Sequence, residues 1–150
     1  MMTTKLQTKI ANVISRSDFC VLYSPYETEA DPQGIPFVLP NKKVIVPCGL
    51  GTDPVDFGKE MAERFLDLSG FVLVPGKKFD RFGGRHGRGC GWYDRFLSTI
   101  PIHWIRIGIC KKESFADTKL VLQEWDEPMD WMIVADKEDF LIYETHARSV

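Results

Sequence analysis

A loop that combines glycine with arginine carries the clearest chemical signal in this sequence of 150 residues. Five of the nine residues from Gly83 to Gly91 are glycine, and arginines stand at positions 81, 85 and 88. The apolar run 71–74 precedes the loop, and Trp92 follows it as the expected start of a helix. A glycine-rich loop between a strand and a helix can offer several backbone N–H groups to an anion. The segment therefore predicts a phosphate-binding site.

The spacing of the glycines matches neither of two common nucleotide-binding motifs. The loop lacks the Gly-Lys-Ser/Thr of a P-loop, and its glycine order differs from that of a dinucleotide-binding fingerprint. A glycine-rich segment can also be a mobile turn that binds nothing. On spacing alone, both interpretations stay open.

Three helices are expected, two before this loop and one after it. Residues 4–16 carry apolar side chains at helical spacing. Asp53 followed by Pro54 is typical of a helix start, and an apolar stripe then continues to Ser69 and Gly70. The third helix is expected at about residues 91–98, directly after the glycines.

Short apolar runs predict strands at residues 19–23, 44–46, 71–74, 105–110, 131–134 and 140–143. Such runs are typical of strands that are buried on both faces of a parallel sheet. We therefore expect an α/β fold, in which one three-layer domain has a mostly parallel central sheet flanked by helices. Ligands of such sheets bind beyond the carboxyl ends of the strands, where the glycine-rich loop begins. Residues 24–40 and 111–128 are expected to be irregular.

Composition restricts the class of partner. The formal net charge is −2, so the chain has no overall attraction to nucleic acid or to an anionic membrane. Its basic character is concentrated at residues 77–95, which favours a small anionic ligand. No apolar run is long enough for a membrane span and no signal peptide is evident, so we expect a cytoplasmic protein. A disulfide framework or zinc site is not expected, because the cysteines are widely separated: Cys20, Cys48, Cys90 and Cys110.

The string from Pro75 to Leu97 closely resembles the signature of the 5-formyltetrahydrofolate cyclo-ligase, or methenyltetrahydrofolate synthetase, family. The matching positions are Pro75-Gly76, Phe79-Asp80 and the run GxRxGxGxGWYDRFL that begins at Gly83. Weaker similarity extends to residues 23–31, which look like the family's first strand and its glutamate-containing loop. Residues 126–133 look like its late segment of an aspartate and a strand.

The resemblance implies a reaction that uses ATP and magnesium to act on a folate. ATP phosphorylates the formyl oxygen of 5-formyltetrahydrofolate, a second folate nitrogen attacks the activated carbon, and phosphate leaves. The product is 5,10-methenyltetrahydrofolate. Phosphoryl transfer depends mainly on positioning and charge neutralisation, which glycine N–H groups and arginines can supply.

The same resemblance implies roles for individual residues. Asp94 and Asp130 match the family's metal-binding aspartates, and two carboxylates with phosphates and waters form an ordinary magnesium site. Glu29 matches its substrate-contacting glutamate, and Trp92 and Tyr93 would lie beside the pterin or adenine ring. The expected ATP and phosphate site comprises Arg85, His86, Gly87, Arg88, Gly89, Cys90, Gly91, Trp92 and Tyr93.

Each of these assignments has a structural alternative. Asp94 could simply stabilise the positive end of its helix, and Asp130 could be a solvated turn residue. Trp92 and Tyr93 could be core aromatics that anchor the helix. Glu29 could be a solvated carboxylate in an acidic, proline-rich loop.

Departures from the family leave a second class of function open. Its members usually begin with an extra helix that contacts ATP, whereas only residues 4–16 precede the first predicted strand here. The segment between Asp31 and Val44 is also short. The alternatives are a non-catalytic relative that binds nucleotide, phosphate or folate, and an ATP-using enzyme with a different substrate. The oligomeric state is left open.

Overall fold

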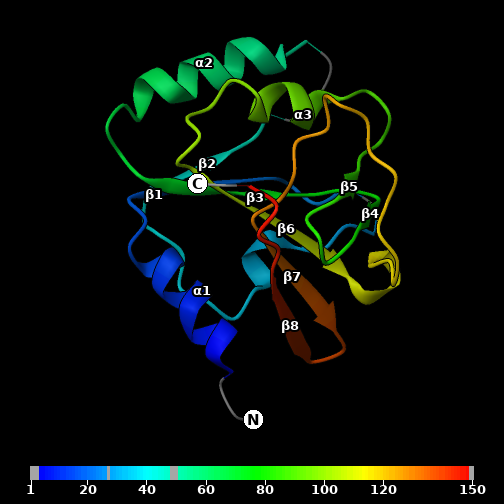
Figure 1. The fold of residues 1–150 in the computed structure, drawn as a ribbon. Helices are drawn as coiled ribbons and strands as arrows, with labels where there is room; N and C mark the ends of the chain where they lie inside the picture. Colours follow the sequence, from blue (N-terminus) through cyan, green and yellow to red (C-terminus); the bar gives the residue numbers. More distant parts are fainter. Residues whose placement is uncertain (1–3, 27, 48–50, 149–150) are drawn as a thin grey trace.

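The structure, a computed structural model, describes residues 4–26, 28–47 and 51–148. Its central layer is a six-stranded sheet with the order β2-β1-β3-β6-β7-β8. Helix α1 (Lys5–Ser15) covers one face of this sheet, and α2 (Pro54–Arg64) and α3 (Trp92–Leu97) cover the other (Figure 1). The predicted α/β fold with three layers is confirmed. In the described part of the chain, no helix has both the length and the apolarity that a membrane span requires.

The sheet is parallel except at one edge. Parallel pairs join β1 (Phe19–Leu22), β2 (Lys43–Ile45), β3 (Gly70–Val74), β6 (Ile105–Lys111) and β7 (Trp131–Asp136). β8 (Asp139–Glu144) pairs antiparallel with β7. The chain runs from β1 to β2 on one side and then returns past β1 to β3, so the direction of winding reverses between β1 and β3. Open α/β sheets bind ligands at such a reversal, beyond the carboxyl ends of the strands.

Alternating side chains of each central strand supply two hydrophobic cores. Val21 and Val72 belong to the core beneath α2 and α3, whereas Leu22 and Leu73 belong to the core on the side of α1. All four are fully buried. This pattern explains why the central strands are apolar throughout. The edge strand β2 differs from the expected buried strand, because no strand covers its outer side and it is half-exposed or exposed along its length.

Helix α2 ends earlier than its apolar stripe predicts. Asp53 accepts hydrogen bonds from the N–H groups of Val55 and Asp56, as expected of the residue before the helix. The helix stops at Arg64, and Asp67 has a positive φ of 65°, which is incompatible with a continuing right-handed helix. Phe65 nevertheless stacks on Phe19 with ring centres 4.2 Å apart. The stripe therefore marks residues that enter the core, although its last turn is not α-helical.

The first half of the glycine-rich loop is an ordered hairpin, which sequence analysis did not anticipate. Strands β4 (Lys78–Phe79) and β5 (Arg85–His86) pair antiparallel. The buried carboxylate of Asp80 accepts hydrogen bonds from the N–H groups of Phe82 and Gly84 at 2.8 Å and from Leu120 at 2.7 Å. One side chain thus closes the hairpin turn and ties it to the segment after β6. That segment is largely irregular, as predicted, apart from a short 3₁₀ turn at Lys112–Ser114.

Replacing Asp80 by alanine is expected to destabilise the fold, because three backbone donors lose one buried acceptor. We expect the free energy of unfolding to fall by about 3 kcal/mol, measured by urea denaturation. The matched control is Asp18→Ala, which removes a single hydrogen bond from the N–H of Ser69 and should cost about 1 kcal/mol. Equal losses in the two variants would contradict this role of Asp80.

Candidate functional site

The loops that follow β1 and β3 meet at the carboxyl edge of the sheet. Arg88 Nη2 lies 3.5 Å from Glu29 Oε2, and the Arg88 guanidinium stacks over the Tyr26 ring at 4.2 Å from its centre. Glu29 Oε1 also accepts a hydrogen bond of 2.8 Å from the N–H of Tyr26. The fold therefore brings together two residues that sequence analysis assigned to different ligands, a glutamate for the substrate and an arginine for phosphate.

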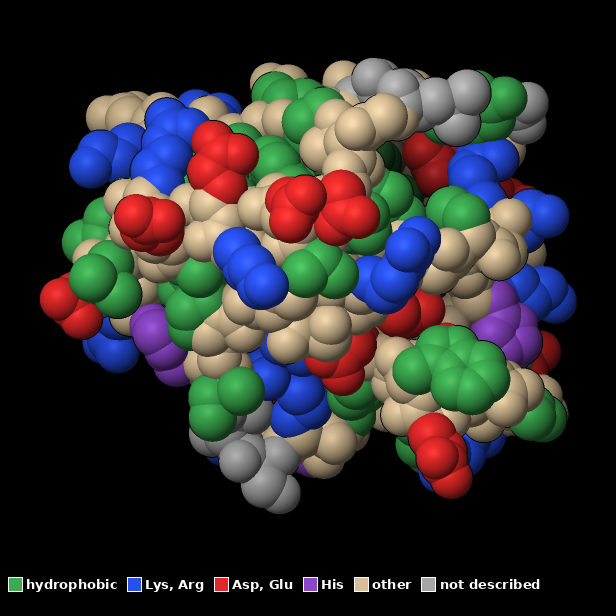
Figure 2. Space-filling view, turned by 90° about the horizontal axis from the view of Figure 1, so that it is seen from above, with side chains coloured by type: hydrophobic (Ala, Val, Ile, Leu, Met, Phe, Trp, Pro, Cys, Tyr) green, Lys and Arg blue, Asp and Glu red, His purple; other side chains and the backbone are tan. Residues whose placement is uncertain are grey.

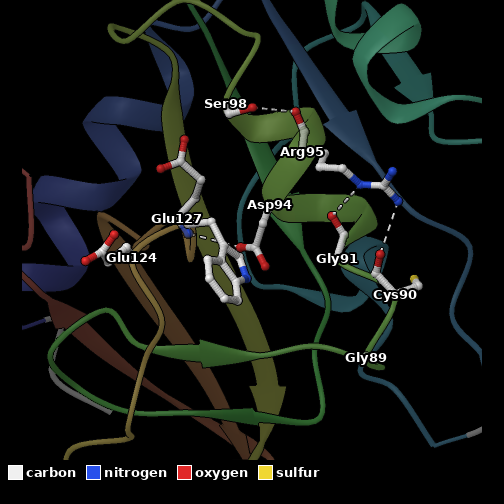
Figure 3. A pocket seen from close by; sticks show the side chains of 9 residues that line it. Gly89, Cys90, Gly91, Asp94, Arg95, Ser98, Glu124 and Glu127 are labelled. Atoms are coloured by element: carbon white, nitrogen blue, oxygen red, sulfur yellow. Dashed lines mark hydrogen bonds between the residues drawn. The ribbon is translucent and has the colours of Figure 1, made fainter.

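The second half of the glycine-rich loop offers a run of free backbone donors. Within the described chain, the N–H groups of residues 87–91 donate no hydrogen bond to the protein. Gly89 and Gly91 have φ values of 98° and 69°, a left-handed conformation that glycine adopts without strain. The carbonyl oxygens of Cys90 and Gly91 are held by the Arg95 side chain (Figure 3). This arrangement suits an anion, because consecutive N–H groups with no internal acceptor can bind phosphate oxygens.

Arg85 and Arg88, the two arginines assigned to the phosphate site, differ in accessibility. Arg85 is buried, and its Nε donates a hydrogen bond of 2.6 Å to the carbonyl of Pro75 at the end of β3. Its Nη1 lies 3.8 Å from Asp94 Oδ1. Burial lowers the pKa of Arg85, and the nearby negative charge of Asp94 opposes this effect. Arg88 is 40% exposed and is the arginine that remains open to a ligand. His86 is exposed, with its Nε2 2.7 Å from the Val121 carbonyl oxygen.

Asp94 lies in the first turn of α3, and its surroundings disfavour the ionised carboxylate. Burial is the main reason that its pKa is raised, while the N–H of Glu127 and the charge of Arg85 act in the opposite direction. The Asp126 carboxylate raises the pKa further, through its charge and a side-chain hydrogen bond. We call Asp94 and Asp126 the carboxylate pair. Two adjacent carboxylates repel each other unless a proton or a cation lies between them.

A pocket of about 510 Å³ opens beside the carboxylate pair. Helix α3 and the end of the glycine loop form one wall, and the turn at residues 124–127 forms the other (Figure 3). The Glu127 N–H donates to Asp94 Oδ1 at 3.0 Å and so fixes the second wall to the first. The pocket has the size of a small-molecule site. It is lined by Gly89, Cys90, Gly91, Asp94, Arg95, Ser98, Glu124, Trp125 and Glu127.

Asp130, the second aspartate expected to bind metal, is engaged elsewhere. It precedes β7 at the amino-terminal edge of the sheet, whereas the glycine loop leaves the carboxyl edge. Its two carboxylate oxygens accept hydrogen bonds from Arg148 at 2.9 and 2.7 Å, and one also accepts from the N–H of Arg106. These contacts favour a structural role. The structure instead places Asp126, four residues earlier, beside Asp94.

The two aromatic residues after the loop are half-buried at the start of α3. Trp92 donates its Nε1–H to the Thr52 carbonyl and packs against Phe57 and Phe96, so it anchors α3 to α2. Tyr93 lies beside Trp92 and beneath the guanidinium of Arg85. These contacts match the structural alternative for Trp92. A role for either ring beside a ligand stays a prediction.

Sequence analysis assigned no role to Asp126 or Trp125, although both border the site. They lie in the segment that was expected to be irregular, where no periodicity indicates which side chains face the sheet. The cluster of acidic residues at 124–127 was the available signal, but it is also typical of a solvated loop. The hydrogen bond from the Glu127 N–H to Asp94 shows which part of the segment reaches α3.

The carboxylate pair offers the donors that a hard divalent cation prefers. Among the residues that the structure describes, no cluster of three or more His, Cys, Asp or Glu side chains is placed to hold a metal. The pair would therefore supply two carboxylate ligands, leaving the remaining positions to phosphate oxygens and water. This division is normal for Mg²⁺, which keeps several waters and is commonly held by one or two carboxylates.

Charges are mixed over the face that α2 and α3 cover. Figure 2 shows acidic and basic side chains interspersed over this face. A polyanion such as nucleic acid is usually bound by a clustered basic face. The face that this view shows therefore carries no single clustered basic patch.

Comparisons with known proteins identify relatives of this site. The family model of the 5-formyltetrahydrofolate cyclo-ligase family matches residues 47–135, which is more than half of the chain. A 5-formyltetrahydrofolate cyclo-ligase of Saccharomyces cerevisiae is 34% identical over 76 residues, which are 47% of this chain and 36% of the yeast protein. A probable 5-formyltetrahydrofolate cyclo-ligase of Caenorhabditis elegans is 37% identical over 73 residues, covering 45% and 34% of the two chains. The chain thus matches about a third of the length of these relatives.

A solved structure extends the similarity of fold over most of the chain. It is a 5,10-methenyltetrahydrofolate synthetase from Mycoplasma pneumoniae, with a TM-score of 0.54 and 18% sequence identity. The superposition covers 87% of this chain and 81% of the other. At this level of identity the similarity concerns the fold.

The raised pKa of Asp94 leads to a direct test by NMR titration of the side-chain carboxyls. We expect Asp94 to titrate above the ordinary aspartate range, and Asp126→Asn to lower its pKa by removing both the charge and the hydrogen bond. Glu124→Gln is the control, because Glu124 lines the same pocket but is not among the groups that shift Asp94. An unchanged Asp94 pKa in Asp126→Asn would show that the carboxylate pair is not coupled.

Proposed function

This chain belongs to the 5-formyltetrahydrofolate cyclo-ligase family, and we propose that it cyclises 5-formyltetrahydrofolate to 5,10-methenyltetrahydrofolate with ATP and Mg²⁺. ADP and phosphate are the other products. The observation that carries this proposal is the carboxylate pair of Asp94 and Asp126 directly beside the free N–H groups of residues 87–91. Asp94 and the loop residues Gly89 and Gly91 line the same pocket, so a metal at the pair and phosphates at the loop would be neighbours, as a nucleoside triphosphate requires.

The chemistry requires activation of a formyl oxygen. The terminal phosphoryl group of ATP is transferred to that oxygen, and the bond to the bridging oxygen of ADP breaks. A second folate nitrogen then attacks the activated carbon, and phosphate leaves with the former formyl oxygen. Such phosphoryl transfer needs precise positioning and neutralisation of negative charge more than a protein nucleophile.

Each part of the site has a task in this scheme. The N–H groups of residues 87–91 bind phosphate oxygens, and the glycines leave space for the phosphates to approach the backbone. Arg88 adds positive charge from a partly exposed position. Arg85 lies too deep to follow a substrate and instead holds the end of β3 against Asp94. The carboxylate pair would hold Mg²⁺, which would neutralise charge on the phosphates.

Glu29 is the proposed contact for the folate. Its side chain is only 10% exposed, and it is fixed by the N–H of Tyr26, so it can present a carboxylate oxygen to amine donors of a pterin ring. The ion pair with Arg88 couples this glutamate to the glycine loop. Folate and nucleotide would therefore bind on adjacent sides of one loop.

The proposal is tested by mixing the protein with Mg-ATP and 5-formyltetrahydrofolate and following the absorbance of the methenyl product. Calorimetric titration with Mg-ATP, with and without the folate, accompanies the assay. We expect binding of both ligands and formation of product. Binding without product would support the alternative of a non-catalytic ligand-binding relative. The absence of binding and product at high protein concentration would contradict the proposal.

Asp94→Asn and Asp126→Asn should each lower turnover by about 100-fold, the scale on which loss of one electrostatic stabiliser slows an enzyme. Both should also weaken binding of Mn²⁺, a probe for the metal site that calorimetry can measure without substrate. Circular dichroism should show an intact fold, because asparagine retains the shape of aspartate. Asp18→Asn is the control, since Asp18 lies before β1 at the opposite edge of the sheet. Unchanged turnover in both site variants would remove the pair from the mechanism.

A further inference from the structure

Trp125 is distinct among the four tryptophans of this chain, because its ring has no evident structural task. Trp104 and Trp131 are buried in the two cores, and Trp92 anchors α3. Trp125 is 69% exposed and lines the pocket beside Asp94. No ring or cation contact to Trp125 is found among the described residues. A large apolar ring left in water at a pocket wall is available for a ligand.

The backbone on either side of Trp125 is anchored. Residues 123–126 form a tight turn, in which the Asp126 N–H donates to the Gln123 carbonyl and the Gln123 N–H donates to Asp126 Oδ2 at 2.7 Å. The next residue, Glu127, is bound through its N–H to Asp94. Trp125 therefore sits between two anchored residues and directly before a member of the carboxylate pair. An anchored backbone lowers the conformational freedom that is lost on binding, because only the side-chain torsions of Trp125 remain to be ordered.

The polar lining indicates which part of a nucleotide would lie here. Glu124 and Glu127 belong to the same turn as Trp125 and line the pocket with it. Ser98, directly after the last residue of α3, lies on the other wall (Figure 3). Carboxylates repel phosphate but accept hydrogen bonds from hydroxyl and amine groups. The phosphate-binding donors, by contrast, lie at the glycine-loop end of the pocket. The pocket thus changes from an anion-binding end to an end suited to a neutral ring with hydroxyl or amine donors.

We propose that Trp125 is the stacking platform for the adenine base of ATP and that Glu124 and Ser98 lie beside its nucleoside. With the triphosphate at residues 87–91 and the metal at the carboxylate pair, the base extends along the wall formed by the turn. Stacking of a base on an aromatic side chain contributes substantially to affinity and tolerates different bases. This inference rests on the proposed function and adds to it the position of the nucleoside and a residue that determines nucleotide affinity.

The test compares Mg-ATP with Mg-tripolyphosphate, which offers the same kind of phosphate chain but no base. Trp125→Ala should raise the Kd of Mg-ATP about 10-fold and leave the Kd of Mg-tripolyphosphate unchanged. Trp125→Phe should restore most of the ATP affinity, because it restores an aromatic face. Mg-ATP should also quench the tryptophan fluorescence of the unaltered protein, and Trp125→Phe should remove most of this quenching. The matched control is Val121→Ala, an exposed apolar residue of the same segment that does not line the pocket.

Several outcomes would overturn this inference. An unchanged Kd for Mg-ATP in Trp125→Ala would show that the base lies elsewhere. An equal loss of Mg-ATP and Mg-tripolyphosphate binding would show that Trp125 acts on the metal or phosphate site. A selective loss of 5-formyltetrahydrofolate binding would assign the ring to the pterin. If the unaltered protein binds neither phosphate ligand, the proposed function fails together with this inference, whereas the first three outcomes leave the proposed function standing.

Discussion

The reversal of winding between β1 and β3 is the constraint on which the site depends. Because β2 lies on one side of β1 and β3 on the other, the loops that leave β1 and β3 start from neighbouring strands at the same edge. One loop carries Glu29 and the other carries the glycines and Arg88, and an ion pair joins them. Residues separated by almost sixty positions thus become two sides of one site. The two apolar cores that hold the sheet rigid are what keep these loops in place.

The chemistry of the site rests on an unresolved electrostatic conflict at Asp94. Burial and the nearby Asp126 oppose ionisation, while Arg85 and the Glu127 N–H favour it. Arg85 is itself buried, and its attraction to Asp94 is offset by the cost of removing the guanidinium from water. Under the proposed function, a divalent cation would relieve the repulsion within the carboxylate pair without a proton.

The two aspartates near the end of the sequence show how closely related residues take different tasks. Asp130 meets Arg148 and the N–H of Arg106 at the amino-terminal edge of the sheet, where it ties the chain after β8 to the start of β7. Asp126 lies four residues earlier, where the return segment crosses α3. The segment between β6 and β7 runs from the carboxyl edge of the sheet back to its amino edge, so successive residues lie at different positions between the two edges. Four residues of chain therefore separate a carboxylate with structural contacts from the one that we propose for the metal site.

The sequence by itself determined the three-layer α/β class and the order of the three helices and of the six strands in the central sheet. It also predicted an anion-binding loop. Apolar runs and glycine positions act locally, so they can be interpreted without knowledge of distant contacts. The sequence could not determine that Asp80 closes a hairpin within the loop, or that Arg85 is buried whereas Arg88 is partly exposed. Nor could it identify Asp126 and Trp125 as residues at the site. These features were decided only by tertiary structure, because irregular segments lack periodicity and their side chains face whatever the rest of the fold places opposite them.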